Sequence, residues 1–266
     1  MTPGGAGQHA GGAGQVGSAL EDVLVHRRWV RRATPFPHVV AQNVFVPDVY
    51  QQLAGHFARL LRECPDAFRR DMAGYDAAGA ALDKHRDGPL ELFLRRDWHD
   101  LIAGVAGVAG TGDVSASLHH HQPGSAAGWP HNDLNPGWFP ADPPPADRVQ
   151  VPADGPVSYH HGTRPDGVGA RETVRAVAVL FYLANPPWQR GDGGETALLA
   201  SGDRGRGPAT LVPPLNNSLV LFECTPHSWH AFCANPRTPR NSLVMWLHRP
   251  KQDAVTRWGE HSIVRW

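Results

Sequence analysis

The chain has 266 residues, and its 25 Lys and Arg side chains balance 25 Asp and Glu side chains. This length can bury the core of one good-sized domain, and the zero net charge does not favour a nucleic-acid or membrane-surface partner. A small neutral or zwitterionic substrate fits this composition better, and the sequence predicts no particular oligomeric state.

The start of the chain differs in composition from the rest. Residues 1–20 are rich in Gly, Ala and Gln and lack the basic start and apolar segment of a secretory signal. We therefore expect a disordered tail followed by a single domain at residues 21–266. The three cysteines have no CxxC spacing, which indicates reduced thiols and a cytoplasmic protein. No apolar run reaches the roughly 18 residues that a membrane-spanning helix needs.

The first third of the chain is predicted to be mainly helical. β-Branched residues in the segment 35–46 indicate an opening strand. Apolar positions then recur at intervals of three and four over residues 49–64, which predicts an amphipathic helix. Residues 71–88 are small, polar and punctuated by glycine, so we expect a loop. A second helix is predicted from residue 89 to about residue 105.

The rest of the chain is predicted to be strands. Apolar, β-branched segments at residues 114–121, 174–184, 218–224 and 241–248 are separated by Gly, Pro and Asn turns. This pattern predicts a mainly β fold of the jelly-roll type with supporting helices. Between the first two of these strands, the Pro, Asp and Gly-rich residues 140–171 form an inserted loop, either a lid over a site or a plain surface insertion.

A chelating pair precedes this insertion, in the segment 128–139. His131 and Asp133 are two residues apart, so an extended backbone places both side chains on one face. A further histidine would complete the 2-His-1-carboxylate triad that binds non-haem Fe(II). His227 and His230 are the two candidates.

A second polar pair follows ten residues after His230. Arg240 and Ser242 lie two residues apart on one predicted strand, so a guanidinium and a hydroxyl share a face. Together they suit a carboxylate held by charge-assisted hydrogen bonds.

This ordered set resembles the Fe(II)/2-oxoglutarate-dependent dioxygenase superfamily. Its members carry H-x-D, a distal histidine and, about ten residues later, R-x-S on a double-stranded β-helix, a cupin-like jelly roll. The prolyl-hydroxylase-like branch is most similar, through Phe181-Tyr182-Leu183-Ala184-Asn185, Trp188, Gly193-Gly194-Glu195 and the opening Pro35-Phe36-Pro37-His38. The resemblance covers about residues 35–250.

The resemblance implies roles for individual residues. Fe(II) would be bound by His131, Asp133 and His230, the last chosen over His227 because of its spacing to Arg240. The distal carboxylate of 2-oxoglutarate would be held by Arg240, Ser242 and Tyr182. O2 would be the oxidant, succinate and CO2 the coproducts, and ascorbate a candidate reductant.

The resemblance also favours a reaction type. Related halogenases replace the metal-binding carboxylate, so Asp133 favours hydroxylation, or a related desaturation or cyclisation. We expect hydroxylation of an unactivated C–H bond in a small molecule, such as an amino acid or a biosynthetic intermediate. The alternatives are a peptidyl or protein hydroxylase of the prolyl type and a metal-binding cupin-like protein without redox activity.

Further residues are candidates for substrate contact because they neighbour these motifs. They are His119, His121, Trp129, Trp138, Arg175 and Glu195. Alternation along the strand 114–121 would point His120 away from His119 and His121. The tryptophans could equally be packing residues.

Overall fold

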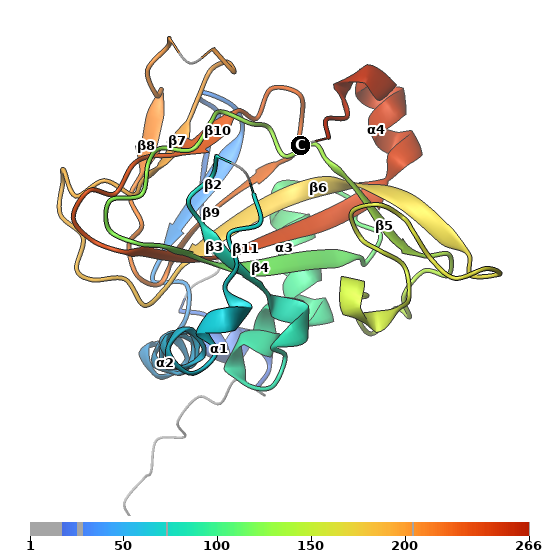
Figure 1. The fold of residues 1–266 in the computed structure, drawn as a ribbon, viewed down its shortest axis with the longest axis horizontal. Coiled ribbons are helices and arrows are strands. Elements are labelled where there is room, and N and C mark those ends of the chain that lie inside the picture. The colour runs from blue at the N-terminus through green and yellow to red at the C-terminus, as the bar shows by residue number, and fades with distance from the viewer. Residues whose placement is uncertain (1–17, 26–28, 73, 204, 266) are drawn as a thin grey trace, which may run out of the picture.

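The computed structural model describes residues 18–265 except 26–28, 73 and 204 (Figure 1). Its α-helices are α1 Leu20–Val23, α2 Pro47–Glu63, α3 Arg96–Ala106 and α4 Lys251–Trp258, and its longest 3-10 segment is η3 Pro89–Leu94. The strands are β1 Val30–Arg32, β2 His38–Gln42, β3 Ala78–Ala81, β4 Val114–His121, β5 Pro136–Pro140, β6 Ala170–Tyr182, β7 Thr196–Leu198, β8 Thr210–Val212, β9 Ser218–Glu223, β10 His230–Phe232 and β11 Arg240–Pro250. None of the helices in the described part of the chain is long and apolar enough to cross a membrane.

The strands form two antiparallel sheets. The larger has eight strands in the order β1-β2-β9-β6-β11-β4-β3, with β5 also paired to β6. Strand β5 pairs with residues 170–174 of β6 and β9 with residues 177–182, both on the edge opposite β11. The smaller sheet has the order β10-β7-β8. In Figure 1 the smaller sheet lies at the upper left, and α1 and α2 lie below the larger sheet.

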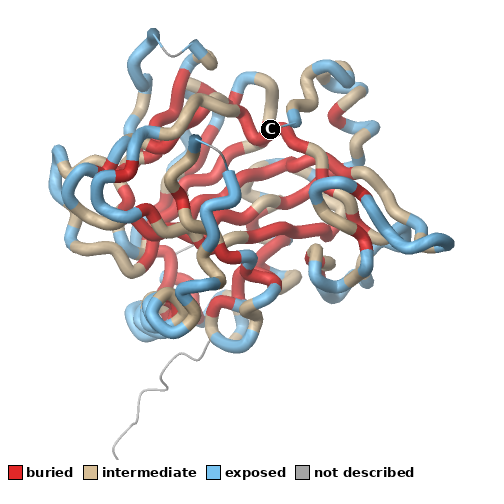
Figure 2. The backbone as a smooth tube through the Cα atoms, viewed as in Figure 1, coloured by how far each residue is buried: buried red, intermediate tan, exposed pale blue. Residues whose placement is uncertain are grey.

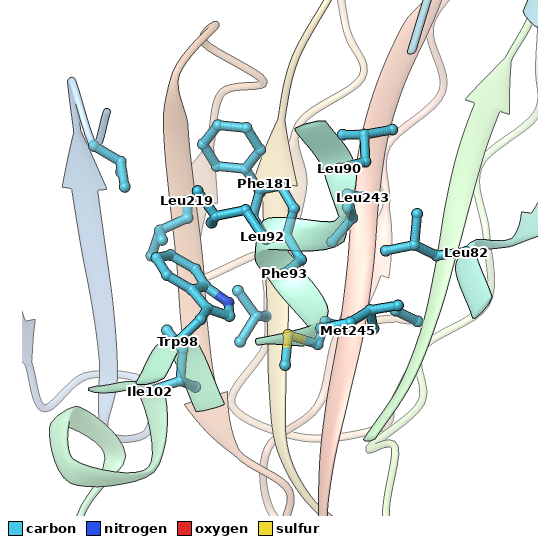
Figure 3. Close-up of a cluster of buried hydrophobic side chains, with 14 of the residues drawn as sticks. Leu82, Leu90, Leu92, Phe93, Trp98, Ile102, Phe181, Leu219, Leu243 and Met245 are labelled. Carbon is cyan, nitrogen blue, oxygen red and sulfur yellow. The ribbon is translucent and has the colours of Figure 1, made fainter. Parts of the chain in front are cut away.

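One face of the larger sheet packs against the helices. Alternate residues of β6, β9 and β11 point to this side because side chains of a strand alternate between faces. Figure 3 shows this layer, in which Phe181, Leu219, Leu243 and Met245 pack with Leu92, Phe93, Trp98 and Ile102. Each fully buried apolar side chain of this kind contributes about 1.5–3 kcal/mol to the free energy of folding. The helices thus hold the sheet rigid from one side, while its strands form most of the buried core in Figure 2.

The other face of the larger sheet is turned toward the smaller sheet. Here the intervening residues of the same strands pack with residues of β7, β8 and the segment after His131, namely Leu180, Tyr182, Val220, Phe222, Val244, Leu134, Leu198 and Val212. Two antiparallel sheets that enclose side chains in this way form the predicted double-stranded β-helix, so the mainly β fold with supporting helices is confirmed.

Several predicted boundaries were wrong for local reasons. The opening strand ends at Gln42, because Asn43 adopts a left-handed conformation with φ of 51°. The expected loop 71–88 contains β3, an edge strand of Ala and Gly that carries no hydrophobic signal. The second helix is split into η3 and α3 by the extended Arg95.

The predicted bounds of the inserted loop and of the N-terminal tail can also be compared with the structure. The inserted loop is shorter than 140–171, because β5 runs to Pro140 and β6 begins at Ala170. Residues 1–17 of the predicted tail lie outside the described residues, and α1 begins at Leu20.

Candidate functional site

Two histidines face each other between the sheets. His131 and His230 form an isolated antiparallel bridge, in which each main-chain N–H donates to the carbonyl of the other at 2.9 and 2.8 Å. The Nδ1 atoms lie 2.9 Å from the Trp129 carbonyl and 3.1 Å from the Ser228 carbonyl. Since a carbonyl can only accept, each Nδ1 carries a proton, and the Nε2 atoms are the ones that face Asp133.

Asp133 completes the cluster. Its carboxylate oxygens lie 3.9 Å from His131 Nε2 and 3.4 Å from His230 Nε2. The residue has a φ of 56°, a left-handed conformation that Asp tolerates better than most residues. The side chain of the preceding residue supports the turn, because Asn132 Oδ1 accepts the Leu134 N–H at 3.2 Å.

The Asp133 carboxylate is 2% exposed and accepts hydrogen bonds from two side-chain donors. Arg175 Nη1 donates to Oδ1 at 3.1 Å, and Trp246 Nε1 donates to Oδ2 at 2.9 Å. Burial alone would raise the pKa of this carboxyl, but His230, Arg175 and His131 together lower it well below its usual value. Asp133 is therefore ionised near neutral pH.

This cluster has the donor set of a metal site. One ligand atom from each of His131, Asp133 and His230 lies within 4.8 Å of the others, and the described residues contain no other group of this kind. Burial, followed by the proximity of His230, lowers the pKa of His131 to about 4, so this imidazole is neutral near pH 7. Two imidazole nitrogens and one carboxylate suit non-haem Fe(II) and leave coordination positions open. His227, by contrast, is exposed and lies outside the cluster.

A buried guanidinium points from β11 of the larger sheet toward the smaller sheet. Arg240, 2% exposed, donates from Nη1 to Ser242 Oγ at 3.0 Å and from Nη2 to Thr196 Oγ1 at 3.2 Å. The Tyr182 hydroxyl lies 2.7 Å from the same Thr196 oxygen. Among the described residues no acidic side chain pairs with Arg240, and its Nε atom has no partner. Since a buried, uncompensated charge is costly, this arrangement fits an incoming carboxylate.

Two histidines of β4 lie beside this guanidinium. In the strand register His121 is paired with Arg240, and His119 with Ser242. His121 is 0% exposed, stacks on Phe232 with 3.8 Å between ring centroids, and neither ring nitrogen has a partner. Both His119 and His121 are thus brought to the Arg240 side of the site. His120 points to the other face, as expected from alternation, where Nδ1 meets Asn241 Oδ1 at 2.7 Å.

These histidines make stability depend on pH. Burial, followed by the charge of Arg240, lowers the pKa of His119 to about 4 from its ordinary 6.5, with Arg175 adding to the shift and Asp133 opposing it. The unfolded chain therefore binds a proton between pH 6.5 and 4 that the folded chain does not, and stability falls as the pH drops through this range. We expect His119→Gln to flatten this dependence in urea unfolding of the metal-free protein from pH 7 to 4.5. Equal slopes for both proteins would contradict the assignment.

The remaining predicted residues divide into two groups. Arg175 and Trp129 lie at the cluster, the latter with its ring 6.4 Å from that of His131. Trp138 lies elsewhere, on β5 under the guanidinium of Arg265, with 4.9 Å between that group and its ring. Glu195 is half-buried beside Cys233, where its carbonyl accepts the Cys233 N–H. The structure thus gives Trp138 and Glu195 no contact with the cluster.

The site also contains residues that the sequence did not single out. Tyr75 lies across Gly128, where a Cβ would come within 2.7 Å of its ring, and it packs beside His121 and Trp129. Trp246 lies two alternations beyond Ser242 on β11, so period-two reading of that strand could have found it. Tyr75 comes from an irregular loop that carries no comparable signal.

A cluster of two histidines and one carboxylate with open positions is typical of non-haem Fe(II) oxygenases. Residues 149–248 match the family model described as the 2OG-Fe(II) oxygenase superfamily. No curated protein matches the sequence closely enough to count as a relative. The family-model match covers less than half of the chain and supports an Fe(II)/2-oxoglutarate-dependent oxygenase, with Fe(II) and 2-oxoglutarate as cofactor and cosubstrate.

Solved structures share this fold at low sequence identity. A prolyl-4-hydroxylase from Pseudomonas putida is 18% identical, with 80% of this chain and 92% of that chain covered and a TM-score of 0.51. A Trichoplax adhaerens prolyl hydroxylase, solved with a peptide fragment of the hypoxia inducible factor oxygen degradation domain, is 15% identical over 79% and 82% of the two chains, with a TM-score of 0.51. The non-haem α-ketoglutarate-dependent epimerase SnoN from nogalamycin biosynthesis is 14% identical over 80% and 78%, also with a TM-score of 0.51.

Proposed function

We propose that this oxygenase hydroxylates an unactivated C–H bond of a small molecule, such as an amino acid or a biosynthetic intermediate. The observation that carries the oxygenase chemistry is the buried Arg240, which lacks an acidic partner among the described residues and points from the larger sheet toward Thr196 of the smaller one. A metal-binding cupin-like protein without redox activity would have no use for such a cation. The neutral overall charge supports a small substrate.

In this proposal His131, Asp133 and His230 hold Fe(II) through their Nε2 and carboxylate atoms. Bound Fe(II) and 2-oxoglutarate supply O2 activation, with succinate and CO2 as coproducts. The contribution of the chain is orientation: carbonyl acceptors fix both imidazole rings, and Arg175 and Trp246 fix the carboxylate. Because Asp133 fills a coordination position that a halide would need, hydroxylation is favoured over halogenation.

Arg240 binds the distal carboxylate of 2-oxoglutarate in this proposal. Its guanidinium is already oriented by Ser242 and Thr196, so little side-chain freedom is lost on binding. The Tyr182 hydroxyl forms a hydrogen bond with Thr196 Oγ1, the same atom that accepts from Arg240. His121 has two unpartnered ring nitrogens at this end of the site and offers a further donor to the same molecule.

The distal metal ligand can be tested by single substitutions. We expect His230→Ala to lose metal binding, because it removes one of three ligands. His227→Ala should bind Fe(II) with the affinity of the native protein, since His227 is exposed outside the cluster. Anaerobic Fe(II) titration of both variants decides between them, and loss of iron from the His227 variant alone would reverse the assignment.

The substrate class needs a separate experiment. The fold is shared by prolyl hydroxylases and by an epimerase of nogalamycin biosynthesis, so it is compatible with peptides as well as small molecules. A peptidyl or protein hydroxylase is therefore the second candidate. Free amino acids and peptide pools should be incubated separately with the enzyme, Fe(II) and 2-oxoglutarate. A mass increase of one oxygen with matching succinate in the free amino acids alone supports the first proposal, and in the peptides alone the second.

A further inference from the structure

The insertion between β5 and β6 is packed into the fold rather than laid over it. Gln150 pairs with the strand that begins at Val114: its carbonyl accepts the Val114 N–H at 2.9 Å, and its N–H donates to Gly112 at 3.0 Å. Three of its valines are buried, namely Val149, Val151 and Val157. Further along, the Tyr159 carbonyl accepts the Trp138 N–H at 2.9 Å. The insertion therefore has fixed attachments on both β4 and β5.

Tyr159 is the residue of the insertion that contacts the site. Its ring lies against Gly137, where a Cβ would approach to 2.5 Å, and edge-on to Phe139 with 5.6 Å between centroids. Its hydroxyl lies 3.3 Å from Arg175 Nε, which donates to it, and 2.9 Å from Ser115 Oγ. Arg175 in turn stacks on Trp246, 3.8 Å from its ring centroid, and donates to Asp133.

The hydrogen bonds beyond the phenol have one consistent direction. Thr173 Oγ1 donates to the Gly137 carbonyl at 2.9 Å and so accepts the His248 Nδ1–H at 3.0 Å. His248 Nε2 is then an acceptor, and Ser115 Oγ, 3.2 Å away, donates to the phenol, so the Tyr159 hydroxyl donates to Nε2 at 3.3 Å. The phenol oxygen is left as the acceptor for the Arg175 Nε–H. A chain of buried and part-buried hydrogen bonds thus runs from the main chain of β5 to the Asp133 carboxylate.

We propose that Tyr159 is a positioning residue of the metal centre, which fixes the Arg175 guanidinium so that Arg175 holds Asp133 in its metal-binding orientation. The insertion then supports the metal ligands from within the fold and is not a lid over the site. This inference rests on the proposed assignment of His131, Asp133 and His230 as the metal ligands. Partners of metal ligands typically change metal affinity 10- to 100-fold when they are removed.

The test is a titration of the metal-free full-length protein with Co(II), followed by its visible absorption bands, which report the geometry of the ligands. Tyr159→Phe keeps the ring and removes the hydroxyl. We expect Co(II) affinity to fall about tenfold and the bands to shift. Native affinity together with native bands in this variant would overturn the inference. If the native protein itself fails to bind Co(II), the ligand assignment is at fault instead.

Controls separate positioning from general loosening of the fold. Ser115→Ala removes another partner of the phenol without touching Arg175, and Tyr50→Phe removes a hydroxyl that meets the Ala184 N–H away from the site. Both should keep Co(II) affinity within about twofold, and an equal loss in Ser115→Ala would argue against the Arg175 route. In an Arg175→Lys background, which lacks the Nε donor, Tyr159→Phe should have no further effect. Additive losses would contradict action through Arg175.

Discussion

Replacing Arg240 with alanine is expected to shift to much higher 2-oxoglutarate concentration the visible charge-transfer absorption that forms when 2-oxoglutarate is added to the Fe(II) protein without oxygen. The guanidinium is buried, and its two nearest polar partners, Ser242 and Thr196, are neutral. Truncating one partner of a buried charge pair costs about 2–5 kcal/mol, so cosubstrate affinity should fall by about 30-fold or more. The titration of absorbance against 2-oxoglutarate concentration measures this change.

A matched variant separates charge from geometry. Arg240→Lys keeps the positive charge but loses the planar fork, so we expect intermediate affinity for 2-oxoglutarate. Fe(II) binding should be native in both variants, because Arg240 has no contact with the triad. An alanine variant with native cosubstrate affinity would show that the distal carboxylate lies elsewhere.

Replacing Asp133 with asparagine should have the second large effect. Asn tolerates the left-handed backbone at this position as well as Asp does, so the turn itself should survive. The amide offers only one acceptor, whereas Arg175 and Trp246 donate to two separate oxygens. One buried donor therefore loses its partner, which costs about 1–3 kcal/mol of stability.

The same change removes the anionic member of the proposed metal site. We expect Fe(II) affinity to fall by about 100-fold or more, because a neutral amide replaces the only charged donor of the cluster. Calorimetric titration of the metal-free variant measures affinity, and urea unfolding measures stability. Asp133→Gly relieves the backbone and also removes both acceptors, so it should lose metal affinity at least as strongly. Unchanged affinity in the asparagine variant would exclude Asp133 as a ligand.

The triad and the arginine could be predicted because their chemistry restricts residue type and their spacing is short. His131 and Asp133 are two residues apart, and Arg240 and Ser242 share a strand face, so local periodicity places each pair. The two faces of the larger sheet follow the same rule. The exposed His227 and the buried His230 could be ranked from their distance to Arg240, and the structure places His230 in the cluster.

The rest of the site depends on pairing between distant strands, which local patterns do not specify. The register that sets His121 beside Arg240 joins strands more than a hundred residues apart. Thr196 lies on a three-residue strand, too short for a periodic signal. Tyr159 and Tyr75 come from irregular segments, where only the completed fold shows what they face.

The bridge between His131 and His230 has a consequence for how this enzyme can vary. Two main-chain hydrogen bonds join residues 99 positions apart and depend on no side chain. The spacing of the two imidazoles is therefore set by the backbone, whatever the length of the segment between them, and longer loops add little closure entropy. Loops in this segment that do not touch the metal centre could be exchanged between relatives to alter substrate choice while the imidazoles of His131 and His230 stay in place.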